Sequence, residues 1–368
     1  MREYWIALNS IDGLGPVRIR RLMEVFGTPQ AVFEASAELS LDKRLIPALS
    51  REALRRKSEL LDAARRQIDE CAENRISILI LDDEDYPVYL KEIFAPPPIL
   101  YVKGDLSVFR DHALAIVGTR IPTTYGKNCT RDLTAELSGS AVIVSGLARG
   151  VDTVAHESCL DAGGKTIAVL GCGLDRIYPP ENKALAKRIC ENGALVSEFP
   201  LGTAPEPYNF PRRNRVISGM SCGVIVIEAG EKSGALITAD YALQQNRTVF
   251  AVPGPITSAV SAGTFKLIRD GAIPIRSSQD VFEHISAINF APHITAPPQK
   301  IRSEMPPRPA LAAEELAVWD ALSDTPDRVD TIAETCGLEI PQILGILLNL
   351  ELKGFITQVG GQMFRRIS

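Results

Sequence analysis

The chain has 368 residues, enough for two or three domains, and its 45% hydrophobic and 23% charged residues are typical of a globular protein. Its seven cysteines are scattered singly, so we expect reduced thiols, a cytoplasmic location, no metal site and no cofactor. The N-terminus lacks a signal-peptide pattern and no apolar run approaches the roughly 20 residues of a membrane helix, so we expect no membrane partner.

The formal net charge of −5 comes from the C-terminal segment. From Leu311 to the end there are nine acidic and four basic residues, so the preceding residues are neutral. A neutral body can still present a local cationic patch, and Arg212, Arg213 and Arg215 lie within four residues. Net charge therefore does not exclude a polyanionic partner.

Residues 1–75 have helical spacing and predict a helical domain of the SAM or helix-hairpin-helix type. The turn from Ile11 to Pro16 contains Gly13 and Gly15 and is typical of a helix-hairpin-helix, whose backbone amides can bind a nucleic-acid phosphate. Thr28-Pro29 predicts the start of a further helix. A purely structural helical module fits this pattern equally well, and both interpretations stay open.

Residues 76–290 predict an extended Rossmann-like core of the α/β class. Two short strands, Ile76 to Leu81 and Ile99 to Val102, flank three consecutive prolines and suggest an extension at the sheet edge. Six apolar, β-branched runs follow. Because each run is apolar on both faces, we expect a parallel sheet covered by helices on both sides. The runs are 113–117, 141–144, 166–170, 194–196, 224–227 and 248–252.

Beyond these runs we expect a helix over 262–272, closed by Gly271, and a last short strand near Pro274. Residues 291–310 hold six prolines and predict an extended linker. Residues 311–368 predict three helices and a glycine-turned hairpin, which together make a winged helix. Its third helix offers few groups for reading bases, so a protein-contact or structural role is favoured over duplex binding.

The residues that follow the predicted strands indicate an anion site. Ligands of an open α/β sheet bind beyond the carboxyl ends of its strands. There, small residues let backbone amides approach a phosphate, and arginines supply forked donors. The candidate residues of this site are Gly118, Thr119, Arg120, Ser145, Gly146, Arg149, Phe210, Arg212, Arg213, Asn214, Arg215, Lys232, Ser233 and Gly234.

Within this set, Arg120 and Arg149 are the strongest candidates for phosphate contact, because each follows a strand end within a glycine-rich turn. The alternative is that they form salt bridges with nearby acids. Lys232 and the two residues after it open a helix and predict an anion nest. Phe210 can either stack on a base or anchor the core, and both possibilities stay open.

Familiar catalytic patterns are missing or incomplete. Neither a dinucleotide fingerprint nor a Walker A loop occurs, so NAD chemistry and ATP hydrolysis are not supported. Asp152 and His156 lie four residues apart and could form an acid–base pair, but a helix-terminal acid and a histidine that hydrogen-bonds a neighbouring loop are favoured. Glu198 or Glu228 could be a base, but each is expected instead to orient loop amides or an arginine. No catalytic residue is therefore assigned.

Four ordered motifs closely resemble those of the DNA-processing protein A (DprA/Smf) family: 118–120, 145–156, 210–218 and 228–238. The resemblance covers essentially the whole chain. It implies a non-enzymatic mediator of natural transformation that binds and protects incoming single-stranded DNA, forms a homodimer through its core and loads the RecA recombinase. In one departure, Phe265 stands where the family commonly has asparagine, so that segment is left out of the site.

The resemblance also implies which residues form the phosphate pocket. Carried over by position they are Gly118, Thr119, Arg120, Ser145, Gly146, Arg149, Arg212, Asn214, Arg215, Ser233 and Gly234.

A second hypothesis is a nucleotide-processing enzyme. The same core resembles the phosphoribohydrolases of the lysine-decarboxylase-like family, which carry Pro-Gly-Gly-x-Gly-Thr-x-x-Glu after the corresponding strand. Here the equivalent stretch, Ala229 to Thr238, lacks the closing glutamate. The sequence therefore favours the binding protein over the enzyme.

Overall fold

The computed structural model describes residues 1–35, 48–285, 311–322, 327–358 and 363–366. The chain divides into two compact units, Met1–His293 and Ile294–Ser368. The predicted linker at 291–310 and the predicted Gly360-Gly361 turn lie outside the described residues.

The first unit begins with helices, as the sequence predicts. Gly13, in the first turn, has a φ of 84°, a left-handed conformation that favours glycine. The Thr28 hydroxyl accepts a hydrogen bond from the amide of Ala31 at 3.2 Å and so caps the next helix. Trp5 and Leu8 share a core cluster with Tyr101 of the sheet, so the helices pack directly on the sheet edge. The helices are α1 (Arg2–Asn9), α2 (Pro16–Phe26), α3 (Pro29–Ala35), α4 (Ala48–Arg55) and α5 (Lys57–Glu73).

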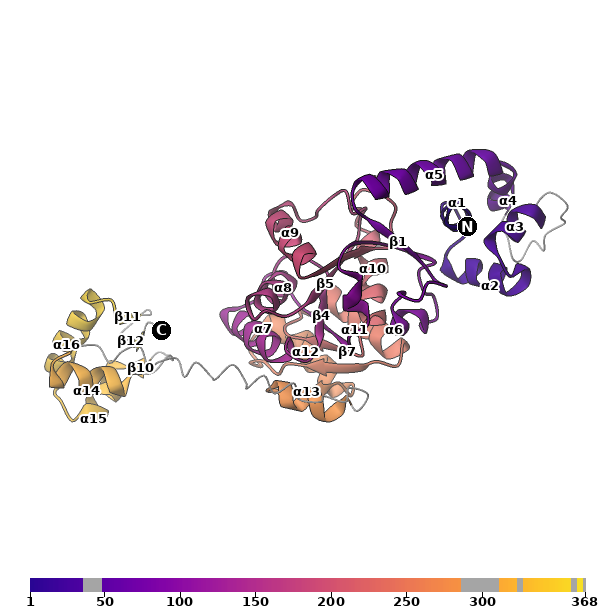
Figure 1. Cartoon of the computed structure of the whole chain (residues 1–368). Coiled ribbons are helices and arrows are strands. Elements are labelled where there is room, and N and C mark those ends of the chain that lie inside the picture. The colour runs from indigo at the N-terminus through magenta and orange to yellow at the C-terminus, as the bar shows by residue number, and fades with distance from the viewer. Residues whose placement is uncertain (36–47, 286–310, 323–326, 359–362, 367–368) are drawn as a thin grey trace. The chain divides into compact units, whose positions relative to one another are not determined.

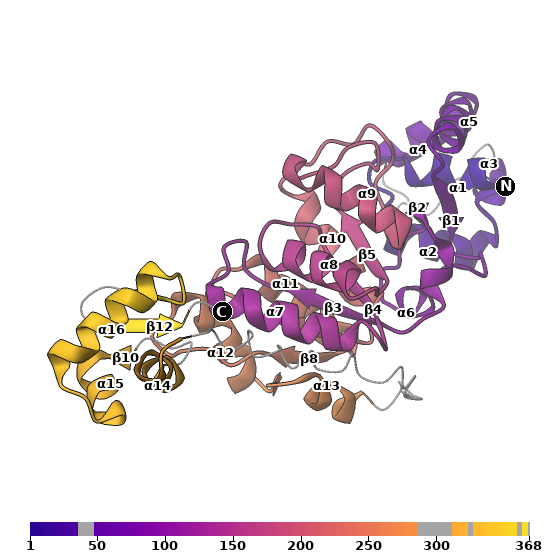
Figure 2. The same cartoon turned by 60° about the vertical axis from the view of Figure 1, so that its left-hand side comes forward.

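A nine-stranded sheet forms the centre of the first unit (Figures 1 and 2). Its order is β1-β2-β6-β5-β4-β3-β7-β8-β9. The strands from β6 to β9 in that order are parallel, and the two at the edge are antiparallel, which confirms the predicted extension. The strands are β1 (Ser77–Ile80), β2 (Ile99–Gly104), β3 (Ala113–Val117), β4 (Val142–Ser145), β5 (Thr166–Leu170), β6 (Gly193–Ser197), β7 (Gly223–Val226), β8 (Thr248–Ala251) and β9 (Ile273–Pro274).

Helices cover both faces of the sheet, because alternate side chains of each strand point to opposite sides. Leu114 and Ile116 of β3 join the core under α7, α8 and α13. Ala115 and Val117 join the core under α6, α10, α11 and α12. The helices are α6 (Val88–Lys91), α7 (Thr124–Leu137), α8 (Val151–Asp161), α9 (Lys183–Glu191), α10 (Asn209–Gly219), α11 (Gly234–Gln244), α12 (Ala262–Arg269) and α13 (Ser278–His284).

The strand order reverses at β3. The chain proceeds from β3 through β4 and β5 to β6 on one side, and later from β7 to β9 on the other. Helices that leave the two sides of such a point diverge, and a crevice opens beyond the carboxyl ends of the neighbouring strands. The fold therefore places a ligand site beyond β3 and β7.

The second unit is a winged helix, as predicted, with its own core around Val318, Ile332 and Leu347. In the described residues its sheet has the order β10-β12-β11, and the short β10 was not predicted from the sequence. Its elements are α14 (Ala313–Ala321), β10 (Asp327–Arg328), α15 (Val329–Cys336), α16 (Ile340–Leu352), β11 (Ile356–Gln358) and β12 (Met363–Arg366).

No single helix among the described residues is long and apolar enough to span a membrane. Helices α15 and α16 reach that length and composition only as a pair bent by 106°.

Candidate nucleic-acid interface

A pocket of about 750 Å³ opens beyond the carboxyl ends of β3 and β7. It lies at the point where the strand order reverses, as expected for an open α/β sheet. The pocket brings together nine of the predicted residues: Gly118, Thr119, Arg120, Phe210, Arg213, Asn214, Lys232, Ser233 and Gly234.

The loop after β3 is fixed through its backbone. The amide of Thr119 donates to the Glu228 carbonyl at 2.7 Å, and the Thr119 carbonyl accepts from the Val151 amide at 3.2 Å. A side chain at Gly118 would put its Cβ 2.6 Å from the Val151 side chain. Arg120 follows on this rigid loop with an exposed side chain that lines the pocket. Its guanidinium is therefore available to an anionic ligand.

The N-terminus of α11 forms another wall of the pocket. Ser233 caps this helix, and its hydroxyl accepts from the amide of Ala235 at 3.3 Å. The Asn214 side chain donates to the Gly234 carbonyl at 3.2 Å and holds the first turn in place. Because the first turn of a helix has unpaired amides and a positive dipole end, this wall with Lys232 attracts anions.

Two aromatic rings stand in the same pocket. The rings of Phe210 and Tyr178 lie 5.5 Å apart at an interplanar angle of 49°. Tyr178 belongs to the segment between β5 and α9 and was not among the predicted site residues. The only signal in the sequence was its place after a strand-end glycine loop. The pair gives the cationic pocket an apolar surface on which a base can stack.

Arg213 is buried and organises the inner side of the pocket. It donates to the carbonyls of Val169 and Gly146, the latter at 2.5 Å. Burial lowers the pKa of Arg213 to about 10 and raises the pKa of Asp152, although Arg213 opposes that rise. Asp152 accepts from the amides of Gly146 at 3.0 Å and Ala148 at 3.3 Å. Arg213 and Asp152 therefore fix the loop that follows β4.

The other five predicted residues do not line the pocket. The Ser145 hydroxyl donates to the Ile116 carbonyl of the neighbouring strand at 2.6 Å, so it is committed to the sheet. Gly146 packs against the Arg213 guanidinium, which leaves no space for a Cβ. Arg149 is exposed and paired with Glu181. Arg212 is exposed too and lies 5.5 Å from the Phe199 ring centroid.

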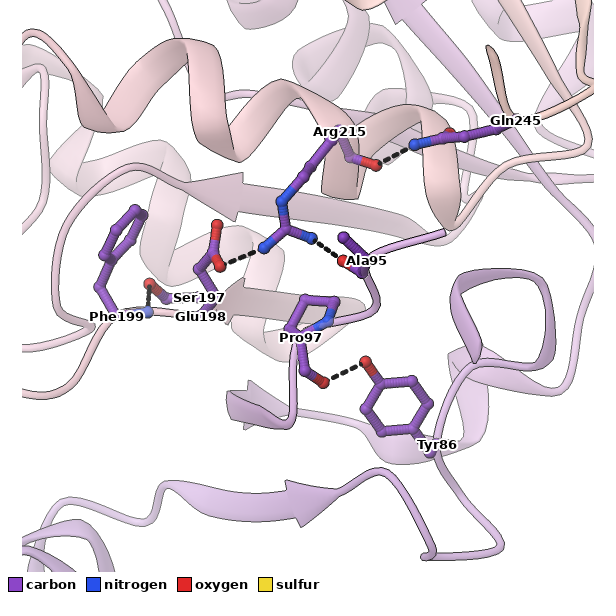
Figure 3. Close-up of polar contacts among 8 residues, drawn as sticks. All are labelled: Tyr86, Ala95, Pro97, Ser197, Glu198, Phe199, Arg215 and Gln245. Atoms are coloured by element: carbon purple, nitrogen blue, oxygen red, sulfur yellow. Dashed lines mark hydrogen bonds and ion pairs between the residues drawn. The ribbon is translucent and has the colours of Figure 1, made fainter. Parts of the chain in front are cut away.

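Arg215 does not line the pocket, and Figure 3 shows its contacts. It lies between Glu198, with which it forms a buried ion pair, and the Ala95 carbonyl, to which it donates at 2.7 Å. In the same view Tyr86 donates to the Pro97 carbonyl at 2.7 Å and steadies the proline segment. We therefore assign Arg215 a structural role in place of the phosphate contact predicted for it.

The candidate acid–base groups are engaged in structural contacts. His156 is buried, and its Nδ1 lies 2.7 Å from the hydroxyl of Thr166, so its partner is on strand β5 and not on a loop as predicted. The Glu228 carboxylate accepts from the amide and hydroxyl of Thr123, at 2.9 and 2.5 Å, at the start of α7. Glu198 holds an arginine. These contacts confirm that Glu198 and Glu228 orient an arginine and a loop amide.

The fold and the pocket define a class of protein: a doubly wound α/β core with a cationic, partly aromatic pocket at its switch point and a separate winged helix. The family model described as DNA recombination-mediator protein A matches residues 77–286, and the DprA winged helix domain matches residues 302–362. The chain belongs to the DprA/Smf family.

Individual relatives agree with this assignment. The chain is 35% identical over 404 residues to Protein Smf of Synechocystis sp., covering 99% of this chain and 98% of that protein. It is 45% identical over 219 residues to the DNA processing protein DprA of Bacillus subtilis, covering 59% of this chain and 74% of that one.

Two solved structures have the same fold. DprA from Streptococcus pneumoniae matches with a TM-score of 0.68 and 33% identity, over 77% of this chain and 98% of that chain. DNA processing protein A from Helicobacter pylori, which was solved for its single-stranded DNA binding mode, matches with a TM-score of 0.52 and 35% identity, over 56% and 94%.

Proposed function

We propose that this protein binds single-stranded DNA in the pocket beyond β3 and β7. The observation that carries the proposal is the combination, in one pocket, of Arg120, the N-terminus of α11 and the Tyr178–Phe210 ring pair. Cations and amides suit a phosphate backbone, whereas aromatic rings suit unpaired bases of any sequence. The solved relative from Helicobacter pylori binds the same class of ligand.

We further propose that the binding serves DNA processing during natural transformation, as the names of the relatives suggest. In this proposal the protein is a mediator without covalent chemistry. It acts as a homodimer in the cytoplasm, protects the incoming strand and loads RecA. Sedimentation velocity tests the homodimer, and a monomer at all concentrations contradicts it. Loading is tested by the rate at which RecA coats a strand already covered by a single-strand-binding protein, and a rate that this protein does not change contradicts loading.

The winged helix is proposed to contact protein rather than duplex DNA. The outer face of α16 exposes Leu344, Leu348 and Leu352, to 39%, 57% and 78%. A helix that reads a duplex presents hydrogen-bonding and cationic side chains at such positions instead.

The phosphoribohydrolase alternative is less well supported. A catalytic carboxylate after β7 would have to be available to a nucleotide, whereas Glu228 is held by Thr123 and does not line the pocket. Release of free base from a nucleoside monophosphate, abolished by Glu228→Ala, would reverse this preference.

The experiment for the main proposal is fluorescence anisotropy with a labelled oligonucleotide, single-stranded and duplex, across a salt series. We expect tight, salt-sensitive, single-strand-preferring binding. Arg120→Ala should weaken it and reduce the log–log salt slope by about 0.7, the value for one phosphate contact on a single strand. Equal affinity for duplex, or no binding at any salt concentration, contradicts the proposal, and an unchanged slope removes Arg120 from the interface.

A further inference from the structure

Arg149 differs from the pocket cations because a carboxylate holds its guanidinium. The Nε of Arg149 donates to Glu181, and the two side chains are 55% and 48% exposed. Ala148, the preceding residue, lines the pocket, whereas Arg149 does not. The ion pair therefore occupies a solvent-accessible cation that lies next to the pocket in sequence but does not line it.

The backbone of Arg149 lies close to that of Arg120. The residue after Arg149 is Gly150, and an added Cβ there would lie 2.4 Å from the Thr119 carbonyl oxygen and 2.6 Å from the carbonyl carbon of Arg120. The two arginines thus come from loops in direct contact. A strand whose phosphate meets Arg120 would bring a neighbouring phosphate towards Arg149.

Glu181 is presented by the same short segment that supplies Tyr178 to the pocket. Asn182 anchors this segment, because its Nδ2 donates to the Leu147 carbonyl at 2.9 Å and lies 2.8 Å from the Thr153 hydroxyl. The carboxylate is consequently fixed beside the loop that carries Arg149. The segment that forms the pocket wall at Tyr178 therefore also fixes the position of Glu181.

The pairing affects both groups. Glu181 raises the pKa of Arg149, and Arg149 lowers the pKa of Glu181, so both are charged at neutral pH. Ion pairs this exposed contribute little to stability because water and salt screen them. A phosphate offers the same guanidinium two acceptor oxygens, so exchange of one partner for the other is not costly.

We propose that Glu181 is a displaceable counter-ion: it occupies Arg149 in the free protein, yields it to a phosphate when single-stranded DNA binds, and thereby limits the affinity. The inference rests on the proposed function and adds to it a residue that opposes binding. Glu181 keeps Arg149 from holding other anions, and a strand displaces it by engaging several phosphates together.

Glu181→Gln tests this proposal in the full chain, with single-strand affinity measured by anisotropy at low and high salt. The amide is isosteric but uncharged, and we expect binding about two- to fivefold tighter at low salt, a range set by the small contribution of exposed pairs. Asp161→Asn is the matched control. Asp161 also forms an exposed pair, with Arg188 at 2.6 Å, but at the other end of α8, about 15 Å along the helix. We expect the Asp161→Asn variant to bind single-stranded DNA with the affinity of the wild type.

Arg149→Ala, alone and combined with Glu181→Gln, separates displacement from simple repulsion between Glu181 and DNA. If the counter-ion is displaced, the increase in single-strand affinity caused by Glu181→Gln is less than half as large in the Arg149→Ala background as in the wild-type background. An equal gain in both backgrounds, or no gain in the wild-type background, overturns the inference while leaving the proposed function intact. Failure of the wild type to bind single-stranded DNA would instead overturn the proposed function.

Discussion

Arg212, Arg213 and Arg215 lie within one turn of α10, yet their environments differ. Arg212 is exposed, Arg213 is buried against the loop after β4, and Arg215 is buried in an ion pair with Glu198. Of the three, only Arg212 has a side chain that is largely exposed to solvent. The three arginines should therefore respond differently to substitution.

We expect Arg215→Ala to destabilise the fold by about 3–5 kcal/mol, because it leaves the Glu198 carboxylate buried without its partner. Arg212→Ala should cost no more than about 1 kcal/mol, the scale of an exposed cation–π contact, while weakening single-strand binding. Urea unfolding and anisotropy on both variants make the comparison. An unchanged unfolding midpoint for Arg215→Ala would show that its ion pair is dispensable.

His156 gives a prediction for pH dependence. Thr166 donates its single hydroxyl proton to the Ile143 carbonyl at 2.7 Å, so the His156 Nδ1 must donate to Thr166. The Nε2 is buried and has no hydrogen-bond partner among the described residues. Protonation there would place an unpaired charge in the core. Burial accordingly lowers the pKa of His156 to about 3.

Because the folded pKa lies below the unfolded value, the unfolded chain binds more protons between the two values. The contribution of neutral His156 to the free energy of unfolding is therefore complete above about pH 6.5 and is lost progressively as the pH falls towards 3. Between pH 7 and pH 5 we expect the wild type to lose about 2 kcal/mol more than His156→Asn, measured by urea unfolding. Parallel pH profiles for the two proteins would contradict this account. The His156→Asn substitution should not change the affinity for single-stranded DNA at pH 7, since His156 does not line the pocket.

At the scale of elements, the start of α11 has to cap a helix and bind an anion at the same position. Ser233 is both the cap and a pocket residue. Asparagine and aspartate cap as well as serine, but only aspartate adds a negative charge where a phosphate would sit. The two functions of this helix start can therefore be separated.

We expect Ser233→Asp and Ser233→Asn to keep the thermal stability of the wild type within about 1 kcal/mol, since both preserve the cap. Ser233→Asp should bind single-stranded DNA much more weakly, whereas Ser233→Asn should bind nearly as the wild type does. Thermal melting and anisotropy distinguish the outcomes. Equal binding by the two variants would mean that no phosphate approaches the start of α11.

At the scale of the whole molecule, every residue that lines the pocket belongs to the first unit. The second unit has a separate core and is acidic. Removal of residues 305–368 should therefore leave single-strand affinity within about threefold of the wild type, because no phosphate contact is lost. A large loss of affinity in anisotropy would show that the winged helix takes part in binding.

The sequence by itself determined the elements and their order. Apolar β-branched runs, capping residues and glycine stops are local signals, so the six core strands and the three helices of the winged helix could be predicted from short segments. The strand-end motifs located the pocket because parallel strands end at one edge of a sheet. For this reason, nine predicted residues lie together in the structure.

Only the tertiary structure decided what each polar side chain contacts. Arg215 meets the Ala95 carbonyl across 120 residues of sequence and Glu198 across 17, and Arg149 meets Glu181 across 32. Tyr178 enters the pocket because β5 ends beside α10, which carries Phe210. Neighbouring residues of a helix point about 100° apart, so a local motif cannot tell which cation faces solvent and which is buried. That depends on the elements packed against it, and hence on contacts distant in the chain.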